Sequence, residues 1–382
     1  MPRHFTPTEF ATRRAKACAA LSEHGFDAIL LFAPESQYWL TGYDTFGYAL
    51  FQCMIATSDG RVHLLTRAPD RLQAQETSVL EPAHIHIWPE HAEADPVSDL
   101  LALLAELDLT GAALGYESRT SGLQDFWGRK LRDALPGIQD ASDVFPALRR
   151  VKSAAEIDMH RKAAALSDDA LDAALASTKA GAYEGEILAN MQAAVLRGGG
   201  DYAGNEFVLG SGSGALLCRS ASGRRHLDAR DQLTIEWSGT YARYHAAMMQ
   251  TLLVGAPDPA HPPMFEAAID ALAACEAAMQ VGASMGDVFD AHVGVFDAKG
   301  FGHARLQACG YGMGAVFPPI WVDFPMFFEG NPLKMQAGQV FFLHMVLMDD
   351  TRGLACCLGH SVLLTERGPE RLSRHAPGMI VL

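Results

Sequence analysis

The chain has 382 residues, of which 49% are apolar and 20% are charged, and its formal net charge at pH 7 is −15. This length exceeds what one ordinary hydrophobic core accommodates, so it predicts two domains. The acidic balance argues against nucleic acid or an anionic membrane as a partner. No apolar run is long enough to span a bilayer.

The cysteines and the start of the chain bear on the compartment. Residues 1–9 lack the basic and then apolar pattern of a secretory signal. The 7 cysteines are scattered and form no Cys-x-x-Cys pair, so disulfides and a thiolate zinc site are not expected. A reducing cytoplasm fits this usage best.

The first part of the chain alternates strand and helix signals. Helical spacing of apolar residues covers 8–24, 96–107 and 120–135, and strand patterns cover 27–33, 50–57 and 62–65. Such alternation is typical of an α/β layer domain, which we place at residues 1–147. Residues 148–153 read LRRVKS and form a basic connector to the second domain, residues 153–382.

Residues 39–52, WLTGYDTFGYALFQ, are unusually aromatic for a connection between elements. Aromatic residues most often serve local core packing, and we give that interpretation the greater weight. The functional alternative is a lip that contacts substrate.

The second part begins with a helix whose start is marked by Ser153 and Glu156, which have the spacing of a capping box. Further helices are expected at 183–199, 263–280 and 286–299, and the segment 310–365 alternates glycine, aromatic and strand patterns. The GSGSG run at 210–214 resembles a phosphate loop only weakly. No Lys-Ser/Thr follows it and no helix is expected after it, so we reject phosphate binding.

The segment 231–255, DQLTIEWSGTYARYHAAMMQTLLVG, predicts a β-hairpin. Its first strand, 233–237, alternates apolar and polar residues and then meets Ser-Gly. Its second strand, 244–254, has apolar and aromatic residues on both faces and predicts a buried strand. Glu236 lies inside the first strand and His245 inside the second. A buried carboxylate costs several kcal/mol unless a partner compensates it, so an acid here suggests a function.

These segments resemble the pita-bread fold of the creatinase, prolidase, aminopeptidase P and methionine aminopeptidase superfamily. The resemblance covers nearly the whole chain. It rests on LLFAPESQYWLTGY (30–43), VKSAAEIDMHRKAA (151–164), the hairpin at 231–255, CGYGMG (309–314), AGQVFFLHM (337–345) and CLGHSVLLTERG (357–368). It implies an α/β N-terminal domain followed by an α+β pita-bread catalytic domain, and a hydrolase that acts on carbon–nitrogen bonds.

Metal-binding members of this superfamily hold two ions through two Asp, one His and two Glu. Carried over one position at a time, these ligands fall on Glu236, Ala247, Tyr311, His344 and Gly359, with His360 next to the last. Alanine and glycine cannot coordinate a metal, and tyrosine is a poor ligand for a hard divalent ion. We therefore expect no metal cofactor and no dinuclear peptidase chemistry.

Creatinase and ectoine hydrolase are members of this superfamily that act on small polar compounds, creatinase without a metal. The segments IEWSGTYARYHAAM, GYGMGAVFPPIW and FLHMVLMDD resemble the ectoine-hydrolase-like group more than prolidase. The histidine that creatinase uses as a base falls near Cys218. The mechanism of creatinase therefore does not transfer directly to this chain.

If the fold is right, one cavity gathers a set of residues suited to proton transfer: Glu236, His245, Tyr311, His344 and His360. A histidine oriented by a carboxylate can activate water, and a tyrosine can donate a hydrogen bond to the developing oxyanion. Arg219 could bind a substrate carboxylate. Further substrate contacts are expected from Asn205, Cys218 and Trp321. Cys218 could also act as a nucleophile beside a histidine, but we give greater weight to its being a small buried hydrophobe.

Each of the other residues also has a structural alternative. His245 can be purely structural, Glu236 can form an ion pair with Arg219 or Arg243, and His360 can face solvent on an edge strand. His344 is hardest to explain structurally, because it interrupts an apolar run and needs a hydrogen-bond partner there.

Three functions compete at this point. The first is a metal-independent hydrolase of a C–N bond in a small polar or zwitterionic compound, ectoine-like or creatine-like. The second is an Xaa-Pro dipeptidase-like metallohydrolase that holds one divalent transition metal through Glu236, His245, His344 and His360. The third is a pita-bread protein that binds a ligand without turnover.

Relatives in the creatinase branch are homodimers in which each N-terminal domain covers the partner's site. That resemblance implies a neighbour's pocket formed in part by Tyr43, Phe46, Tyr48, Phe51 and Gln52. Aromatic walls would attract a small cationic substrate by cation–π interaction.

Overall fold

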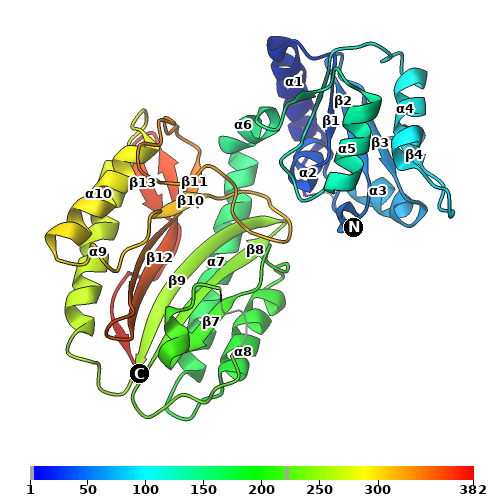
Figure 1. Ribbon diagram of the computed structural model, residues 1–382. Helices are drawn as coiled ribbons and strands as arrows, with labels where there is room; N and C mark the ends of the chain where they lie inside the picture. The colour runs from blue at the N-terminus through cyan, green and yellow to red at the C-terminus, as the bar shows by residue number, and fades with distance from the viewer. Residues whose placement is uncertain (1–3, 220–222) are drawn as a thin grey trace. The chain divides into compact units, whose positions relative to one another are not determined.

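The computed structural model describes residues 4–219 and 223–382. The chain divides into two compact units, with the boundary between Arg150 and Val151. Figure 1 shows both units, and each is described here by itself. Within the described residues, no helix combines the length and the apolar character that crossing a bilayer requires.

The first unit is built on a six-stranded sheet of order β4-β3-β2-β1-β5-β6. Most neighbouring pairs are parallel, and β2 is antiparallel to both β1 and β3. The strands are β1 (Ala28–Leu31), β2 (Cys53–Thr57), β3 (Val62–Thr66), β4 (Ile85–Ile87), β5 (Leu114–Tyr116) and β6 (Gln139–Asp140).

Helices and short 3-10 turns surround this sheet. Helix α1 has the sequence signals of a stable helix: Thr6 caps its start by accepting a hydrogen bond from the Glu9 amide, and Gly25 ends it at φ 72°. The elements are α1 (Pro7–His24), α2 (Pro34–Thr41), η1 (Gly47–Ala49), η2 (Ala68–Asp70), α3 (Arg71–Thr77), η3 (Pro82–His84), α4 (Pro96–Glu106), α5 (Asp125–Ala134) and α6 (Val144–Arg150).

The second unit is built on an eight-stranded sheet, with the path β10-β11-β12-β9-β8-β7 and with β13 and β14 added to β12 and β9. Strands β8, β9, β11 and β12 are long and antiparallel to one another. The strands are β7 (Val208–Ser211), β8 (Asp231–Tyr241), β9 (Tyr244–Val254), β10 (Gly310–Gly312), β11 (Val340–Asp349), β12 (Leu354–Thr365), β13 (Gly368–Arg371) and β14 (Ile380–Val381).

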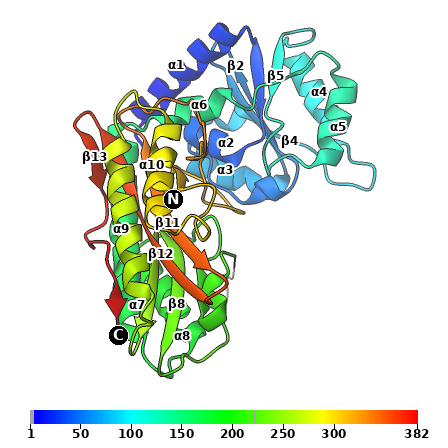
Figure 2. The ribbon, with the colours of Figure 1, turned by 60° about the vertical axis from the view of Figure 1, so that its left-hand side comes forward.

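Helices α7 and α9 pack on this sheet, α7 against β8 and β9 and α9 against β11 and β12, while α8 packs mainly against α7 and α10 packs against α9 (Figure 2). The predicted capping box is present: Ser153 accepts from the Glu156 amide, and the Glu156 carboxylate accepts from the Ser153 amide. The helical elements are α7 (Ala154–Ser177), α8 (Glu184–Arg197), η4 (Gly212–Leu216), α9 (His261–Ala278) and α10 (Met285–Ala298).

The predicted hairpin is present, but its turn lies later than expected. Strand β8 continues through Ser238 and Gly239, and the turn is formed by Ala242 and Arg243 at φ 50° and 65°. The Ser-Gly pair is not a turn, because a Cβ at Gly239 would lie 2.1 Å from the Ala163 carbonyl oxygen of α7. Glycine here lets the helix backbone approach the strand closely.

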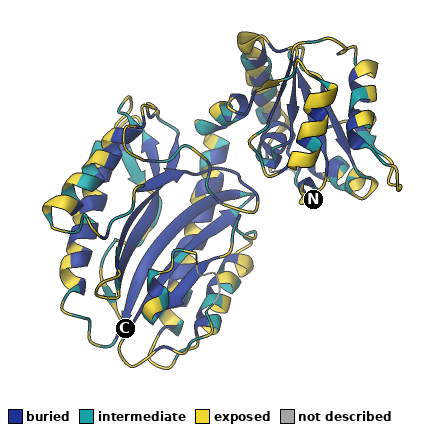
Figure 3. Cartoon of the chain, in the orientation of Figure 1, coloured by how far each residue is buried: buried dark blue, intermediate teal, exposed yellow. Residues whose placement is uncertain are grey.

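Burial follows the layers. All residues of β9 are buried, as its apolar pattern predicts, and most residues of the other long strands are buried as well (Figure 3). The longer helices present one buried and one exposed side, whereas α2 is buried at nearly every residue. The middle of this sheet is thus well shielded, and Glu236 of β8 lies within it as a residue of intermediate exposure.

Candidate functional site

One row of residues crosses four strands on a single face of the second sheet. Glu236 of β8 lies opposite Met249 of β9, and Met249 lies opposite Gly359 of β12. Gly359 in turn lies opposite His344 of β11. Residues directly opposite one another in neighbouring strands project to the same face. The register therefore brings Glu236 and His344, far apart in sequence, to one face with only a methionine and a glycine between them.

Tyr311 joins this face from the short strand β10. It lies opposite Phe342, two residues before His344, and so projects to the same side of the sheet. Its ring centroid is 5.7 Å from that of His344. The Tyr311 hydroxyl lies 3.4 Å from Glu236 Oε1, which is long for an O–H···O hydrogen bond. The hydroxyl proton is therefore available to a bound molecule.

The carboxyl group of Glu236 has an unusual protonation equilibrium. Desolvation by burial raises its pKa from 4.5 to about 7, against the opposing influence of the Arg219 charge and of the Tyr311 hydroxyl. Such a carboxyl exchanges its proton near neutral pH, which is the property that a general acid or base needs.

A chain of hydrogen bonds holds Tyr311 in place. The indole Nε1 of Trp321 donates to the Tyr311 hydroxyl at 2.7 Å, and the Trp321 amide donates to Asn205 Oδ1 at 3.0 Å. Because an indole N–H only donates, it occupies a lone pair of the phenol and leaves the phenol proton to point elsewhere. Asn205 and Trp321 thus orient the hydroxyl group. Burial and the neighbouring Glu236 charge keep the pKa of Tyr311 well above its usual range, so the hydroxyl remains a donor.

Arg219, an exposed residue, contributes a positive charge that acts on the groups of this face. Its charge lowers the pKa of Glu236, of Tyr311 and of His344 alike. The neighbouring Cys218 is only partly buried, but desolvation and the Glu236 charge raise the pKa of its thiol. A thiol of this kind is a poor nucleophile at neutral pH, which favours the packing interpretation of Cys218.

His344 is a neutral, buried imidazole. It is 7% exposed, and burial lowers its pKa to about 4. Its Nδ1 is buried and has no hydrogen-bond partner among the described residues. A buried polar atom without a partner is costly, so a ligand or water molecule that satisfies it would bind favourably here.

His245 does not join the catalytic group as expected. Its Nδ1 donates to the Arg243 carbonyl and its Nε2 accepts from the Gly204 amide, both at 2.8 Å. Both ring nitrogens are therefore used by the backbone, and burial lowers the pKa of the imidazole to about 4. The residue lies opposite Thr240, about 13 Å along the strand from the row of Glu236. The structural alternative describes it better.

His360 also lies elsewhere. It follows Gly359 in β12, and successive residues of a strand project to opposite faces. Its Nε2 donates to Glu276 of α9 at 2.6 Å, on the helix-covered face. The expected grouping of His360 with Glu236 is therefore wrong by one residue of register. The hypothetical metal site formed by Glu236, His245, His344 and His360 is therefore also wrong, because His360 projects to the opposite face of the sheet.

The aromatic segment of the first unit is mostly core. Tyr43, Tyr48, Phe51 and Gln52 are between 1% and 7% exposed, and the Tyr43 hydroxyl donates to Gln52 Oε1 at 3.3 Å. These four residues pack within their own unit and do not offer a surface to a partner's site. Phe46 is different, because 83% of its surface is exposed.

The five positions that carry metal ligands in the resembling superfamily all lie on the face of Glu236. Ala247 lies opposite Ser238, two residues from Glu236, and Gly359 lies in the row itself. Neither has a donor atom. A Cβ at Gly359 would lie 2.7 Å from the Leu343 carbonyl oxygen and 2.9 Å from the Phe342 ring, so this position has no room for a ligand side chain. The residues present do not fit a dinuclear metal site. Among the described residues, no three His, Cys, Asp or Glu side chains are grouped as a metal site would require.

Two polar residues on the same face as Glu236, Thr234 and Thr251, were not singled out in the sequence analysis. The hydroxyls of Thr234 and Thr251 lie 3.0 Å apart, and Thr251 also accepts from the Cys357 amide at 2.9 Å. Alternation along 234, 236 and 238 indicates that Thr234 shares the face of Glu236, so the sequence held this signal. Glu276, the partner of His360, had no such signal because it lies on a separate helix.

Comparisons with known proteins agree with this architecture. The pattern of metallopeptidase family M24 matches residues 158–366, and that of the creatinase/prolidase N-terminal domain matches residues 13–151. Ectoine hydrolase of Halomonas elongata is 26% identical over 392 aligned positions, covering 97% of this chain and 96% of that protein. An Xaa-Pro dipeptidase of Pyrococcus furiosus is 20% identical, covering 95% of this chain and 97% of the other.

A solved structure gives the same result for the fold. Dipeptidase PepE of Mycobacterium ulcerans superimposes with a TM-score of 0.86 at 22% identity, covering 100% of this chain and 99% of that one. The expected fold class, an α/β N-terminal domain and an α+β pita-bread domain, is confirmed. At this identity the likeness establishes the fold alone.

Proposed function

We propose that this chain, which belongs to metallopeptidase family M24 and is a hydrolase of carbon–nitrogen bonds, cleaves a small zwitterionic compound such as ectoine or creatine without a metal ion. One observation carries the proposal. Glu236, His344 and Tyr311 share a face near the charge of Arg219, whereas positions 247 and 359 of that face have no donor atoms.

Glu236 is the proposed general base. With a pKa of about 7, it is substantially ionised at neutral pH and still basic enough to accept a proton. It removes a proton from a water molecule whose oxygen forms a bond to the carbon of the scissile C–N bond. This replaces the earlier hypothesis of a histidine base, because His344 with a pKa of about 4 is a much weaker base.

Tyr311 and the protonated Glu236 complete the reaction. The Tyr311 hydroxyl donates a hydrogen bond to the atom that gains electron density when water adds. Glu236 then returns its proton to the nitrogen as the C–N bond breaks, so the carboxylate is regenerated. His344, neutral at this pH, offers its unpaired Nδ1 to the substrate or to the attacking water.

The substrate class follows from charge. Arg219 can bind a substrate carboxylate, and the ionised Glu236 favours a cationic centre close to the scissile bond. A molecule with both groups is zwitterionic. The name of the Halomonas elongata relative, ectoine hydrolase, supports this choice over a peptide substrate.

The proposed independence of the reaction from metal ions can be tested directly. We expect purified protein to turn over ectoine or creatine at the same rate before and after incubation with EDTA, and to contain far less than one equivalent of iron, zinc or manganese. Activity is measured by amine or carboxylate release and metal content by mass spectrometry, with Xaa-Pro dipeptides screened in parallel. Stoichiometric metal together with chelator-sensitive cleavage of Xaa-Pro would favour the dipeptidase-like alternative.

Compartment and assembly are part of the proposal. All 7 cysteines of the described chain are free, which suits a reducing cytoplasm. We propose a homodimer in which the N-terminal unit of one subunit covers the site of the other. Phe46 is the aromatic residue of this segment whose side chain is exposed, at 83%.

Replacing Phe46 by alanine should raise KM about tenfold with little change in kcat, because the cationic part of the substrate loses one aromatic wall. Leu72, 65% exposed in the same unit, is the control, and Leu72→Ala should leave both constants unchanged. Steady-state kinetics and sedimentation measure the two aspects. An unaltered KM for Phe46→Ala, or a monomer at assay concentration, would rule out the covered site.

A further inference from the structure

The basic connector contributes a buried positive charge to the second unit. Lys152 lies just after the boundary between the units, and its side chain is 4% exposed. A buried ammonium group is costly unless an acid compensates it. Asp323 is such an acid: its side chain is 10% exposed, and its Oδ2 lies 3.8 Å from Lys152 Nζ. Because water reaches this pair so poorly, the attraction between the two charges is screened little.

The backbone of Lys152 has a defined position. Its amide donates to the Gly338 carbonyl at 2.9 Å, and the Gly338 amide donates to the Leu364 carbonyl of β12 at 2.8 Å. Helix α7 begins two residues after Lys152, at the capping box of Ser153 and Glu156. The lysine is therefore attached both to the sheet and to the first helix of this unit, which makes it a fixed point for a partner charge.

Asp323 belongs to a segment that runs beside β10, residues 321–326, which we call the flanking segment. The Asp323 amide donates to the Gly312 carbonyl at 3.0 Å, and the Gly312 amide donates to the Pro325 carbonyl at 2.8 Å. Tyr311 forms an isolated β-bridge with the same segment. Strand β10 therefore has β11 on one side and the flanking segment on the other.

Two glycines leave the space that Asp323 occupies. A Cβ at Gly312 would lie 2.3 Å from the Asp323 carbonyl oxygen, and a Cβ at Gly314 would lie 2.1 Å from Asp323 Oδ2. Glycine at these positions lets the neighbouring backbone and the carboxylate approach closely. The carboxylate thus lies between the backbone at Gly314 and the ammonium group of Lys152, and this enclosure fixes its place.

The flanking segment begins with the tryptophan that contacts Tyr311. Trp321 lies two residues before Asp323, and its Nε1 donates to the Tyr311 hydroxyl at 2.7 Å. That hydroxyl lies 3.4 Å from Glu236 Oε1. The Trp321 amide is held by Asn205 on one side, and Asp323 is the anchor on the other. Since a hydrogen bond weakens steeply with a poorer angle, the indole orients the hydroxyl only while the segment keeps its place.

We infer that the buried pair of Lys152 and Asp323 positions Trp321, and through it the Tyr311 hydroxyl, for the reaction at Glu236. This inference rests on the proposed function, in which Tyr311 acts on the charge that develops in the transition state. Neither member of the pair touches the substrate in this scheme, so both are positioning residues. Loss of either charge lets the flanking segment move and leaves the hydroxyl with the same chemistry in the wrong place.

A first experiment observes the indole of Trp321 without any turnover. The protein contains 5 tryptophans, and fluorinated tryptophan gives each of them a fluorine NMR resonance. The resonance of Trp321 is identified by its loss in Trp321→Phe. We expect Asp323→Asn, which keeps the shape of the side chain and removes its charge, to shift or broaden this resonance. Lys152→Met should change the same resonance, and Lys152→Arg, which keeps the charge, should restore it.

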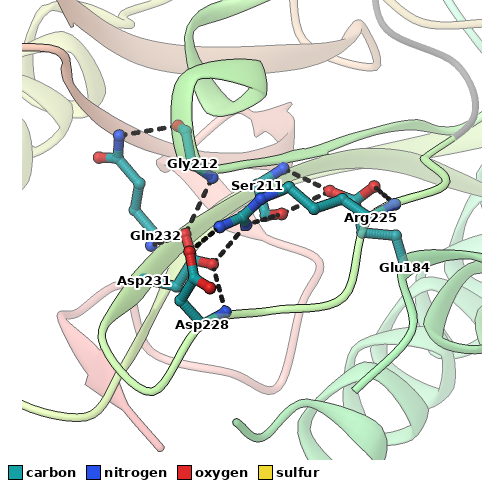
Figure 4. Close-up of polar contacts among 7 residues, drawn as sticks. All are labelled: Glu184, Ser211, Gly212, Arg225, Asp228, Asp231 and Gln232. Atoms are coloured by element: carbon teal, nitrogen blue, oxygen red, sulfur yellow. Dashed lines mark hydrogen bonds and ion pairs between the residues drawn. The ribbon is translucent and has the colours of Figure 1, made fainter. Parts of the chain in front are cut away.

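A second ion pair of this unit supplies the matched control (Figure 4). Asp231, whose side chain is 3% exposed, pairs with Arg225, and its Oδ1 accepts from the Gly212 amide at 2.9 Å. It anchors a backbone as Asp323 does, but at the start of β8, about 17 Å along the strand from Glu236. Asp231→Asn should lower the melting temperature, as Asp323→Asn does, and leave the indole resonance unchanged.

A second experiment tests the route through Tyr311 by a double-mutant cycle. Asp323→Asn should lower kcat about tenfold with little change in KM, because a misplaced hydroxyl costs transition-state stabilisation and not substrate binding. In a Tyr311→Phe background the same substitution should add less than twofold, since no hydroxyl remains to be positioned. If Asp323→Asn folds poorly, Lys152→Met takes its place, and Lys152→Arg should recover most of kcat.

The outcomes separate this inference from the proposed function. An unchanged indole resonance in Asp323→Asn would overturn the positioning role. An equal loss of kcat in the wild-type and Tyr311→Phe backgrounds would do the same. A shifted resonance in a protein that turns over none of the zwitterions would support the positioning of Trp321 and contradict the proposed function.

Discussion

Glu236→Gln should lower kcat about 10³-fold at pH 8, the scale of a lost general base, while the substrate still binds. Glutamine has the shape of glutamate but cannot accept the proton of the attacking water. In the wild type, activity should rise with pH through about 7, because the ionised carboxylate is the active form and its pKa lies there. The residual activity of the variant should lose that transition.

The control for this substitution is Glu206→Gln, which changes an exposed glutamate of the same domain. It should retain the wild-type rate and pH profile. Steady-state kinetics between pH 5 and 9 measure both proteins. A Glu236→Gln variant with full kcat would remove Glu236 from the mechanism, and an unchanged pH transition would assign the titrating group to another residue.

The same carboxyl affects stability with a defined sign. Its pKa is higher in the folded chain than in the unfolded chain, so its contribution to stability is present at acid pH and is lost as pH rises from about 4.5 to 7. Allowing for partial exposure, we expect about 2 kcal/mol. Between pH 4 and 8 the free energy of unfolding should therefore fall more for the wild type than for Glu236→Gln. Urea denaturation measures this difference.

Tyr311→Phe should lower kcat about 10²-fold and leave KM almost unchanged, because the hydroxyl acts on charge that develops only in the transition state. The ring contacts with Phe342 and His344, at centroid distances of 5.3 and 5.7 Å, remain available to phenylalanine. The fold should therefore be preserved, although Trp321 Nε1 loses its acceptor.

Tyr202→Phe is the matched control, since this tyrosine is 75% exposed and its hydroxyl should not matter. Comparison of kcat and KM for the two variants separates a catalytic hydroxyl from a structural one. If Tyr311→Phe instead raises KM and keeps kcat, the phenol binds the substrate and does not stabilise the transition state.

Local signals predicted the elements well. The capping box at Ser153, the apolar run of β9 and the stop at Gly25 each gave an element within a residue or two of its observed position. The turn of the central hairpin was placed too early, because Ser-Gly is usually a turn signal. Only the approach of α7, a tertiary contact, explains why glycine stands inside the strand.

The sequence indicated which site residues share a face where the family resemblance placed them in known strands. Glu236, Tyr311 and His344 lie on one face of the sheet, in the three strands that the motifs indicated, and their catalytic roles stay predictions. The prediction for His360 was wrong because neighbouring residues in a strand project to opposite faces, so an error of one residue places the side chain on the wrong side. The prediction for His245 was wrong for another reason: it shares the face, but the nearby Arg243 carbonyl and the distant Gly204 amide occupy both of its ring nitrogens. Sequence alone does not show such partners.

The glycine at position 359 has a consequence for how this protein can change. Its Cα lies against the neighbouring strand, so restoring a glutamate there requires β11 and β12 to separate as well as a new side chain. Ala247 is fully enclosed and presents a similar barrier. Single substitutions therefore do not lead back to a two-metal peptidase. In directed evolution, we expect substitutions of the residues around Glu236 to be accepted far more readily than substitutions that restore a two-metal site.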